Sequence, residues 1–213
     1  MKNKIVLLGA GGQAKIVLDL IDKNKQYDVL AILDDNQLIH NTKLLNQPVV
    51  GDLDKIQDYS KNEVGFIVCI ADNLRRKEIF NKVVKLGYEP LNVIAKTSNI
   101  SNFAKLGKGI AIADYCNVHP DVTLGDNIII GPMSSVAHDS LVESHVHLSS
   151  GCRLAGNVTI KECADLGTAV SVIPGKTIGE NSVLGAGAVV VKDIEPNCLA
   201  VGIPAKKIKK FEV

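Results

Sequence analysis

Residues 118–142 read VHPDVTLGDNIIIGPMSSVAHDSLV, and within this stretch every sixth residue is Val, Leu or Ile. The same register continues without exception from Ile94 to Val190, so that seventeen consecutive groups of six residues begin with an aliphatic residue. Ile, Leu and Val fill 67 of the 213 positions. In a chosen register, chance would produce such a run with a probability on the order of 10⁻⁹, so the stretch is a repeat with a period of six residues.

The other positions of the repeat indicate the fold. The fifth residue of each six is small or β-branched except at Lys176, Gly recurs at the second position, and Asn recurs at the fourth. Gly and Asn tolerate the positive φ angles that sharp corners need. A period of six does not fit a helical heptad. We therefore expect a parallel β-helix with three short strands per coil, whose first-position residues point inward, and no large insertion within 94–190.

The first ninety residues follow a different pattern, in which apolar runs alternate with helical spacing. Strands are expected at 4–10, 29–35, 49–50 and 64–71, and helices at 11–24, 53–59 and 73–87. Strands that alternate with helices imply a small parallel sheet with crossover helices. The sequence thus predicts a Rossmann-like α/β domain over residues 1–92, followed by a β-helix domain with a C-terminal tail over 93–213.

A glycine-rich turn, Gly9-Ala10-Gly11-Gly12-Gln13, joins the first expected strand to the first helix. Such a turn lets the backbone approach a phosphate at the positive N-terminus of the helix. Asp34 and Asp35 end the next strand and could accept hydrogen bonds from a sugar or a base. Two alternatives stay open, a tight structural turn and an NAD site. Against NAD, about ninety residues supply only half of a dinucleotide-binding fold.

Four of the five histidines lie in the repeat, at 119, 138, 145 and 147. Their spacing, and that of the cysteines, does not match a zinc site, so no metal is expected. His138 is followed by Asp139. An imidazole with a pKa of about 6.5 can accept a proton near neutral pH, and an adjacent carboxylate can orient it. The pair fits direct acyl transfer from a thioester to an amine or hydroxyl, although a coil histidine could also be an ordinary surface residue.

Composition argues against several other classes of protein. With 24 basic and 23 acidic residues, the formal net charge of +1 gives no electrostatic basis for binding nucleic acid or a membrane surface. Aromatic residues make up only 4% of the chain and Trp is absent, which argues against base stacking. The five cysteines are odd in number and lack a CxxC pair, as expected for a cytoplasmic protein. The apolar run at 5–10 is too short for an export signal or a membrane span.

The repeat resembles the left-handed β-helix of hexapeptide-repeat acyltransferases, and the handedness is taken from that resemblance. The segments GAGGQA, LDD, IADNLRR, VAHDS, LAGNV and VGIPAKKIK occur in this order over nearly the whole chain. Together they look like the sugar O-/N-acyltransferase family, which includes bacterial UDP-4-amino-sugar N-acetyltransferases of bacillosamine synthesis and sialic-acid O-acetyltransferases. The resemblance implies acetyl-CoA as the acyl donor, a nucleotide sugar as the substrate, and a homotrimer with its active site between protomers.

The resemblance also implies roles for individual residues. His138 would be the general base and Asp139 its acidic partner. Residues that would bind acetyl-CoA are His147, Thr168, Gly185 and Ala186. Residues that would bind the nucleotide sugar are Gly11, Gly12, Gln13, Asp34, Asp35, Asn73 and Arg76. Gln13 stands where the family usually has a histidine near the acceptor sugar. Lys206, Lys207, Lys209 and Lys210 could attract the phosphates of CoA or could form a solvated basic tail.

The function expected from these features is acetyl-CoA-dependent N-acetylation of a nucleotide-linked amino sugar, by direct transfer and without a covalent enzyme intermediate. One alternative is an O-acetyltransferase that acts on sialic acid or another sugar hydroxyl. An alternative of another class is a non-catalytic module that binds a nucleotide sugar during assembly. The intact VAHDS segment at 136–140 argues against this last function.

Overall fold

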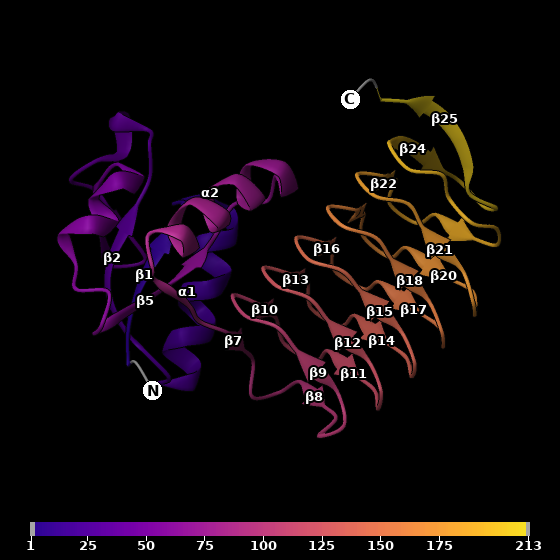
Figure 1. Ribbon diagram of the computed structural model, residues 1–213, viewed down its shortest axis with the longest axis horizontal. Coiled ribbons are helices and arrows are strands. Elements are labelled where there is room, and N and C mark those ends of the chain that lie inside the picture. Colours follow the sequence, from indigo (N-terminus) through magenta and orange to yellow (C-terminus); the bar gives the residue numbers. More distant parts are fainter. Residues whose placement is uncertain (1–2, 212–213) are drawn as a thin grey trace. The chain divides into compact units, whose positions relative to one another are not determined.

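The structure is a computed structural model that describes residues 3–211 (Figure 1). The chain divides into two compact units. The first unit extends through Val93 and includes Lys108–Ile110, and the second contains Ile94–Gly107 and the residues from Ala111 onward.

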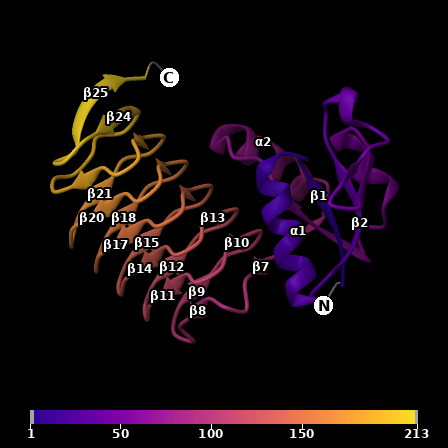
Figure 2. The same ribbon diagram turned by 180° about the vertical axis from the view of Figure 1, so that it is seen from behind.

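The first unit is a six-stranded sheet with one helix on each face, as Figures 1 and 2 show from opposite sides. The strand order is β3-β4-β2-β1-β5-β6, and all neighbours are parallel except β3 and β4. Its strands are β1 (Lys4–Leu8), β2 (Asp28–Leu33), β3 (Lys43–Leu44), β4 (Gln47–Gly51), β5 (Val64–Val68) and β6 (Glu89–Pro90). Its helices are α1 (Gly12–Asn24) and α2 (Asn73–Lys85), with short 3₁₀ helices η1 (Gln37–Ile39) and η2 (Leu53–Asp58).

The central strands of this sheet are apolar along their whole length because both of their faces are covered. Val6 and Phe66 pack in one buried cluster with Phe80 of α2, and the rings of Phe66 and Phe80 lie 5.8 Å apart. Ile5 and Leu7 alternate with these residues along β1 and are fully buried on the opposite face. The apolar runs of the sequence thus become strands covered by a helix on each side.

Some local elements differ from the sequence-based expectation. The segment expected as a helix at 53–59 forms the 3₁₀ helix η2. The short strand expected at 49–50 belongs to the longer strand β4, which forms an antiparallel hairpin with β3. Leu45 and Asn46 make its turn with φ angles of 46° and 69°. Strand β6 is not among the expected strands, and it accommodates Pro90 because it lies at the edge of the sheet.

The second unit is a three-sided parallel β-helix. Two-residue strands recur every six residues from β7 (Val93–Ile94) to β23 (Val189–Val190). Each strand pairs in parallel with the strand 18 residues along the chain, as Asn117 of β11 does with Ser135 of β14. One coil therefore contains three strands. The expected fold class, an α/β domain followed by a parallel β-helix, is confirmed.

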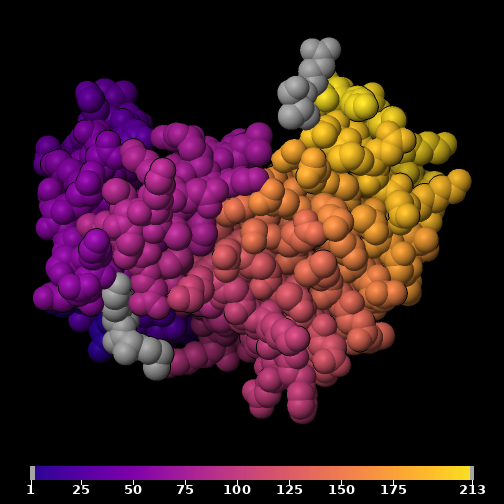
Figure 3. Space-filling model, viewed as in Figure 1, coloured from indigo at the N-terminus to yellow at the C-terminus, as the bar shows by residue number. Residues whose placement is uncertain are grey.

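The three faces of the β-helix are named here after their first strands. The β7 face consists of β7, β10 (Ala111–Ile112), β13 (Ile129–Ile130), β16 (His147–Leu148), β19 (Asp165–Leu166), β22 (Val183–Leu184), β24 (Cys198–Val201) and the antiparallel β25 (Lys206–Lys210). The β8 face consists of β8 (Asn99–Ile100), β11 (Asn117–Val118), β14 (Ser135–Val136), β17 (Arg153–Leu154), β20 (Ser171–Val172) and β23. The β9 face consists of β9 (Lys105–Leu106), β12 (Thr123–Leu124), β15 (Leu141–Val142), β18 (Thr159–Ile160) and β21 (Thr177–Ile178). In the space-filling view the coils follow one another as bands from magenta to yellow (Figure 3).

The interior of the β-helix is a stack of aliphatic side chains. The first-position residues from Ile112 to Val190 are at most 3% exposed, as the repeat predicts. Ser134, Ser140 and Ser182 at the fifth position are also buried, and each of them joins two coils. For example, the hydroxyl of Ser140 donates to the carbonyl of Ala155 and accepts from the N–H of Val158. These hydroxyl groups keep their hydrogen bonds inside the apolar stack.

The corners use glycine in a different way from the expectation. The fourth position has a positive φ angle throughout the middle of the coil, at Asn127 as expected but also at Tyr115 and Met133. The glycines at the second position instead allow close approach between coils. A Cβ atom on Gly131, for example, would lie 2.5 Å from the backbone nitrogen of Ser150. Their role is steric, because any side chain there would overlap the next coil.

Candidate active site

His138 and Asp139 lie on the turn between β14 and β15, where the β8 face meets the β9 face. Nδ1 of His138 lies 2.7 Å from Oδ2 of Asp139, and the two side chains are 65% and 60% exposed. The carboxylate accepts the Nδ1 proton, which leaves Nε2 as the basic nitrogen of the ring. The structure therefore presents an oriented imidazole to the exterior of the coil.

The backbone of this turn is fixed to the next coil. The carbonyl of His138 accepts a hydrogen bond from the N–H of Asn157 at 2.9 Å. The adjacent Ser140 binds the same coil through Ala155 and Val158. The exposed His138 side chain thus extends from a rigid element rather than from a flexible loop, which favours precise chemistry.

The residues expected to bind acetyl-CoA lie along a different part of the coil. His147 is in β16, Thr168 follows β19, and Gly185 and Ala186 follow β22, so all four belong to successive coils on or next to the β7 face. His147 is half-buried, and its Nδ1 lies 3.7 Å from Oδ1 of Asp165 one coil on. Thr168 and Ala186 are exposed at the same corner. The structure brings this predicted group together as one strip.

The strip does not include His138 and Asp139. His147 is a sixth-position residue, so its side chain points outward from the β7 face, whereas His138 lies at the corner opposite that face. In a three-sided prism these two positions are on opposite sides. A single chain therefore does not bring His138 and His147 to one site.

The glycine turn of the first unit lies at the carboxyl end of β1. Gly9 is required by the fold, because its φ angle is 103° and a Cβ would lie 2.7 Å from Ile70 and 2.9 Å from the carbonyl oxygen of Cys69. A Cβ on Gly11 or Gly12 would have no atom within 4 Å. Among the residues that the structure describes, no side chain caps the N-terminus of α1, which begins here. Folding alone thus explains Gly9, but it does not explain the two glycines that follow.

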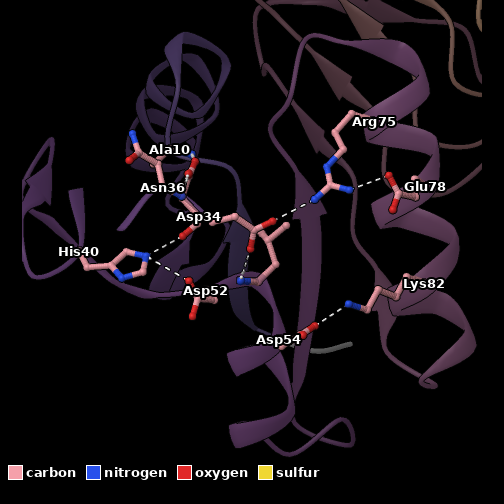
Figure 4. Close-up of polar contacts among 11 residues, drawn as sticks. Ala10, Asp34, Asn36, His40, Asp52, Asp54, Arg75, Glu78 and Lys82 are labelled. Carbon is pink, nitrogen blue, oxygen red and sulfur yellow. Dashed lines mark hydrogen bonds and ion pairs between the residues drawn. The ribbon is translucent and has the colours of Figure 1, made fainter. Parts of the chain in front are cut away.

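The side chain of Asp34 binds the backbone of this turn, as Figure 4 shows, and Asp35 binds residues farther along the sheet edge. The Asp34 carboxylate accepts from the N–H of Ala10 at 2.8 Å and from that of Asn36 at 2.9 Å. The Asp35 carboxylate accepts from the N–H of Leu53 and from Nη2 of Arg75, at 3.2 and 2.9 Å. The two carboxylates therefore connect the ends of neighbouring strands at the carboxyl edge of the sheet.

The two residues of helix α2 that are expected to bind the nucleotide sugar, Asn73 and Arg76, are both buried. Asn73 is the first residue of this helix. Arg76 is fully buried, and its Nη1 donates to the carbonyls of Ile70 and Ala71 at 3.1 and 3.0 Å. Its guanidinium group thus shapes the loop after β5 rather than facing solvent. The sequence does not predict the contact of Arg75 with Asp35 over 40 positions, because only the folded sheet brings these residues together.

The structure also gives the positions of Gln13 and of the lysines in the C-terminal tail. Gln13 is half-buried in the first turn of α1. The tail lysines lie on the exposed strand β25. Nζ of Lys207 pairs with Oε2 of Glu195 at 2.5 Å, and this hydrogen bond lowers the pKa of Glu195 and raises that of Lys207. Part of the basic tail therefore has an acidic partner within the same unit.

One hollow in the first unit does not coincide with these residues. It has a volume of about 640 Å³ and lies beside the second half of α1 and the start of β2, where Leu18, Lys25 and Asp28 line it. Within residues 3–211, His, Cys, Asp and Glu form no group of three that could hold a metal ion. In the same part of the chain, no helix has the length and apolar character needed to cross a membrane.

The sequence and the structure of this chain are similar to those of known proteins. Residues 4–83 match the family model of the PglD N-terminal domain. The structure of PerB from Caulobacter crescentus in complex with CoA and GDP-perosamine has 33% sequence identity and a TM-score of 0.91, covering 97% of each chain. The acetyltransferase domain of PglB from Neisseria gonorrhoeae, in complex with acetyl coenzyme A, has 28% identity and a TM-score of 0.92, covering 98% of this chain and 100% of that one.

The matches to three curated proteins each cover less than half of the chain. Galactoside O-acetyltransferase from Escherichia coli is 38% identical over 90 residues, which are 42% of this chain and 44% of that protein. The chain spans less than half the length of this and other curated relatives that it matches.

An α/β unit with a glycine turn, followed by a left-handed β-helix, is the architecture of the acyltransferase class of hexapeptide-repeat proteins. The structural similarity to PerB and to the acetyltransferase domain of PglB extends over nearly the full chain, so it indicates a particular family within this class. The chain belongs to the hexapeptide-repeat sugar acetyltransferase family.

Proposed function

We propose that the protein is an acetyl-CoA-dependent N-acetyltransferase that acts on a nucleotide-linked amino sugar. The observation that carries this proposal is the exposed His138–Asp139 pair, with 2.7 Å between Nδ1 and Oδ2, in a chain of this family. The likeness to the complex of PerB with CoA and GDP-perosamine supports both substrate classes.

His138 is the general base in this mechanism. Its Nδ1 proton is held by Asp139, so Nε2 accepts a proton from the amine as the nitrogen attacks the thioester carbonyl. The C–N bond forms, the C–S bond breaks, and the departing thiolate of CoA takes up a proton. Asp139 stabilises the imidazolium ion that forms in between. Direct transfer needs no covalent enzyme intermediate.

The first unit binds the nucleotide sugar at the carboxyl edge of its sheet. The chain first runs from β1 to β2 and β4 and then returns to β5 on the other side of β1, and ligands bind where the strand order reverses in this way. The N-terminus of α1, which no side chain caps, offers backbone N–H groups and a positive dipole end to a phosphate. Gly11 and Gly12 leave open space for that phosphate. Asp34, Asp35, Asn73 and Arg76 build the surrounding loops.

Acetyl-CoA binds along the strip formed by His147, Thr168, Gly185 and Ala186. Because His138 lies on the opposite side of the prism, a complete site takes its base from one chain and its acetyl-CoA strip from a second. We propose a homotrimer on this basis. Ile173 and Val191 of the β8 face are 38% and 37% exposed, and they give that face an apolar surface for protomer contact. Five buried cysteines, none of them in a disulfide within the described residues, fit the cytoplasmic location that we propose.

O-acetylation is the second candidate. The similarity to galactoside O-acetyltransferase favours it, and Gln13, which cannot titrate as the histidine usual in this position does, leaves the acceptor group open. A general base beside the acceptor serves a hydroxyl as well as an amine. The non-catalytic alternative needs the His138–Asp139 pair to have no chemical role.

A substrate panel separates these functions. The protein is incubated with acetyl-CoA and nucleotide sugars that carry either an amine or only hydroxyl groups, and products are analysed by mass before and after mild base. An acetyl group that survives base is an amide and supports N-acetylation, whereas one that is removed is an ester. Nucleotide-sugar binding in isothermal titration without any binding of acetyl-CoA would support the non-catalytic module instead.

A further inference from the structure

Gly156 lies one coil beyond His138, at the same position of the repeat. A Cβ atom on Gly156 would lie 2.6 Å from Cε1, 2.8 Å from Nε2 and 3.2 Å from Nδ1 of the His138 ring. The ring therefore rests directly against the backbone of the next coil. We propose that Gly156 is a positioning residue for catalysis, whose missing side chain leaves room for the imidazole; this inference rests on the proposed function.

Gly156 differs from Gly125, Gly131 and Gly179, which also allow close approach between coils. At Gly125, Gly131 and Gly179 an added Cβ would meet backbone atoms of the next coil, so glycine is required there for folding. At Gly156 the three nearest atoms all belong to one exposed side chain. The φ angle of Gly156 is also outside the left-handed region, so alanine fits its backbone. Folding does not require glycine at this position, but the observed ring position does.

The added methyl group would act on the reacting edge of the ring. It would lie beside Cε1 and Nε2, and Nε2 is the atom that takes the proton in the proposed mechanism. Because the side chain of His138 is exposed, the ring would move while the coil stays in place. A displaced ring loses its contact with Asp139, and a misplacement of about 1 Å can reduce a rate by roughly 100-fold.

The test compares Gly156→Ala with Gly175→Ala. Gly175 is at the same corner one coil further, its N–H donates to the carbonyl of Gly156, and a Cβ there would meet nothing within 4 Å. Its φ angle is 69°, and Ala169 already occupies the same repeat position at 60°. Gly175→Ala should lower the melting temperature by roughly 2–4 °C and leave kcat unchanged.

Gly156→Ala should instead lower kcat and leave the melting temperature nearly unchanged. We expect kcat to fall by roughly 10–100-fold, KM for acetyl-CoA to change by less than about threefold, and the melting temperature to stay within about 2 °C of the wild type. In a His138→Ala background the same substitution should change kcat by less than about twofold, because the ring it displaces is gone. Wild-type kcat in the single variant, or a full additional loss in the double variant, overturns the proposal.

A crystal structure of Gly156→Ala gives a readout that does not depend on activity. The expected result is a rotated His138 ring with Nδ1 beyond hydrogen-bond distance of Asp139, on an unchanged coil. An unmoved ring overturns the positioning role even if the enzyme is impaired. If the wild-type protein acetylates no nucleotide sugar, only the proposed function fails, because the ring position is still measured.

Discussion

The carboxylate of Asp34 holds the N–H of Ala10 across 24 positions of the chain, with 2.8 Å between Oδ2 and N. Its other oxygen accepts from the N–H of Asn36 at 2.9 Å. One side chain at the end of β2 therefore fixes the loop that leaves β1. The glycine turn owes its conformation to a neighbouring strand as well as to its own residues.

Asp34→Ala should destabilise the protein and weaken substrate binding together. Loss of two charge-assisted hydrogen bonds is expected to lower the free energy of unfolding by about 1–3 kcal/mol, and KM for the nucleotide sugar should rise. Urea denaturation and steady-state kinetics measure the two effects. The control is Asp54→Ala, which removes an exposed ion pair with Lys82 and should cost less than about 1 kcal/mol. Equal losses in the two variants would contradict the role of Asp34.

Gly12→Ala separates phosphate binding from a purely structural turn. Gly12 is the first residue of α1, and a Cβ there meets nothing within 4 Å, so alanine should leave stability unchanged or raise it by up to about 1 kcal/mol. KM for the nucleotide sugar should rise roughly 10-fold, because the methyl group enters the space proposed for a phosphate. Gly9→Ala is the matched control and should destabilise the fold through its 2.7 Å contact with Ile70. An unchanged KM in Gly12→Ala would favour the structural turn.

Asp121, one coil earlier, provides a matched control for a substitution of Asp139. Asp139 and Asp121 occupy the same repeat position with φ angles of 60° and 59°, and both are exposed. Asp139→Ala should reduce kcat by at least about 10-fold, since the ring of His138 loses its partner, whereas Asp121→Ala should retain wild-type kcat. Both should unfold at similar temperatures. A similar kcat in the two variants would show that the carboxylate of Asp139 does not assist the base.

The cysteines should resist labelling in the folded protein. All five are buried, and burial raises the pKa of Cys69 and Cys116 above the usual range for thiols and that of Cys152 to about 11. At pH 8 these three groups stay protonated and unreactive. A thiol-reactive dye should therefore label fewer than about one cysteine per native chain within minutes and all five in guanidinium chloride. Rapid labelling of the native protein would contradict the packing of the coil.

The repeat made most of the second unit predictable from sequence. A six-residue period fixes which residue points inward, and Val136, Val142 and Leu148 are fully buried as expected. The corner positions with positive φ angles were harder to predict from the sequence, because Tyr115 and Met133 occupy them as well as Asn127. Packing between coils holds these residues in place, so local preference for glycine or asparagine is not needed.

The contacts of the candidate site were predictable only where sequence neighbours form them. The His138–Asp139 pair is adjacent in the chain and could be expected. The bond of Arg75 to Asp35 and the proximity of Gly156 to His138 depend on strand pairing. Gly156 carries one sequence signal, its distance of 18 residues from His138, which is one coil. Burial of Arg76 has no such signal, because it follows from how α2 covers the loop after β5.

The most direct test of the central claim is the turnover number of His138→Ala for acetyl transfer from acetyl-CoA to a nucleotide-linked amino sugar. The side chain is 65% exposed, so circular dichroism and thermal unfolding should match the wild type. Loss of the general base should lower kcat at least about 100-fold. A correctly folded variant that turns over at nearly the wild-type rate would show that His138 is not the base.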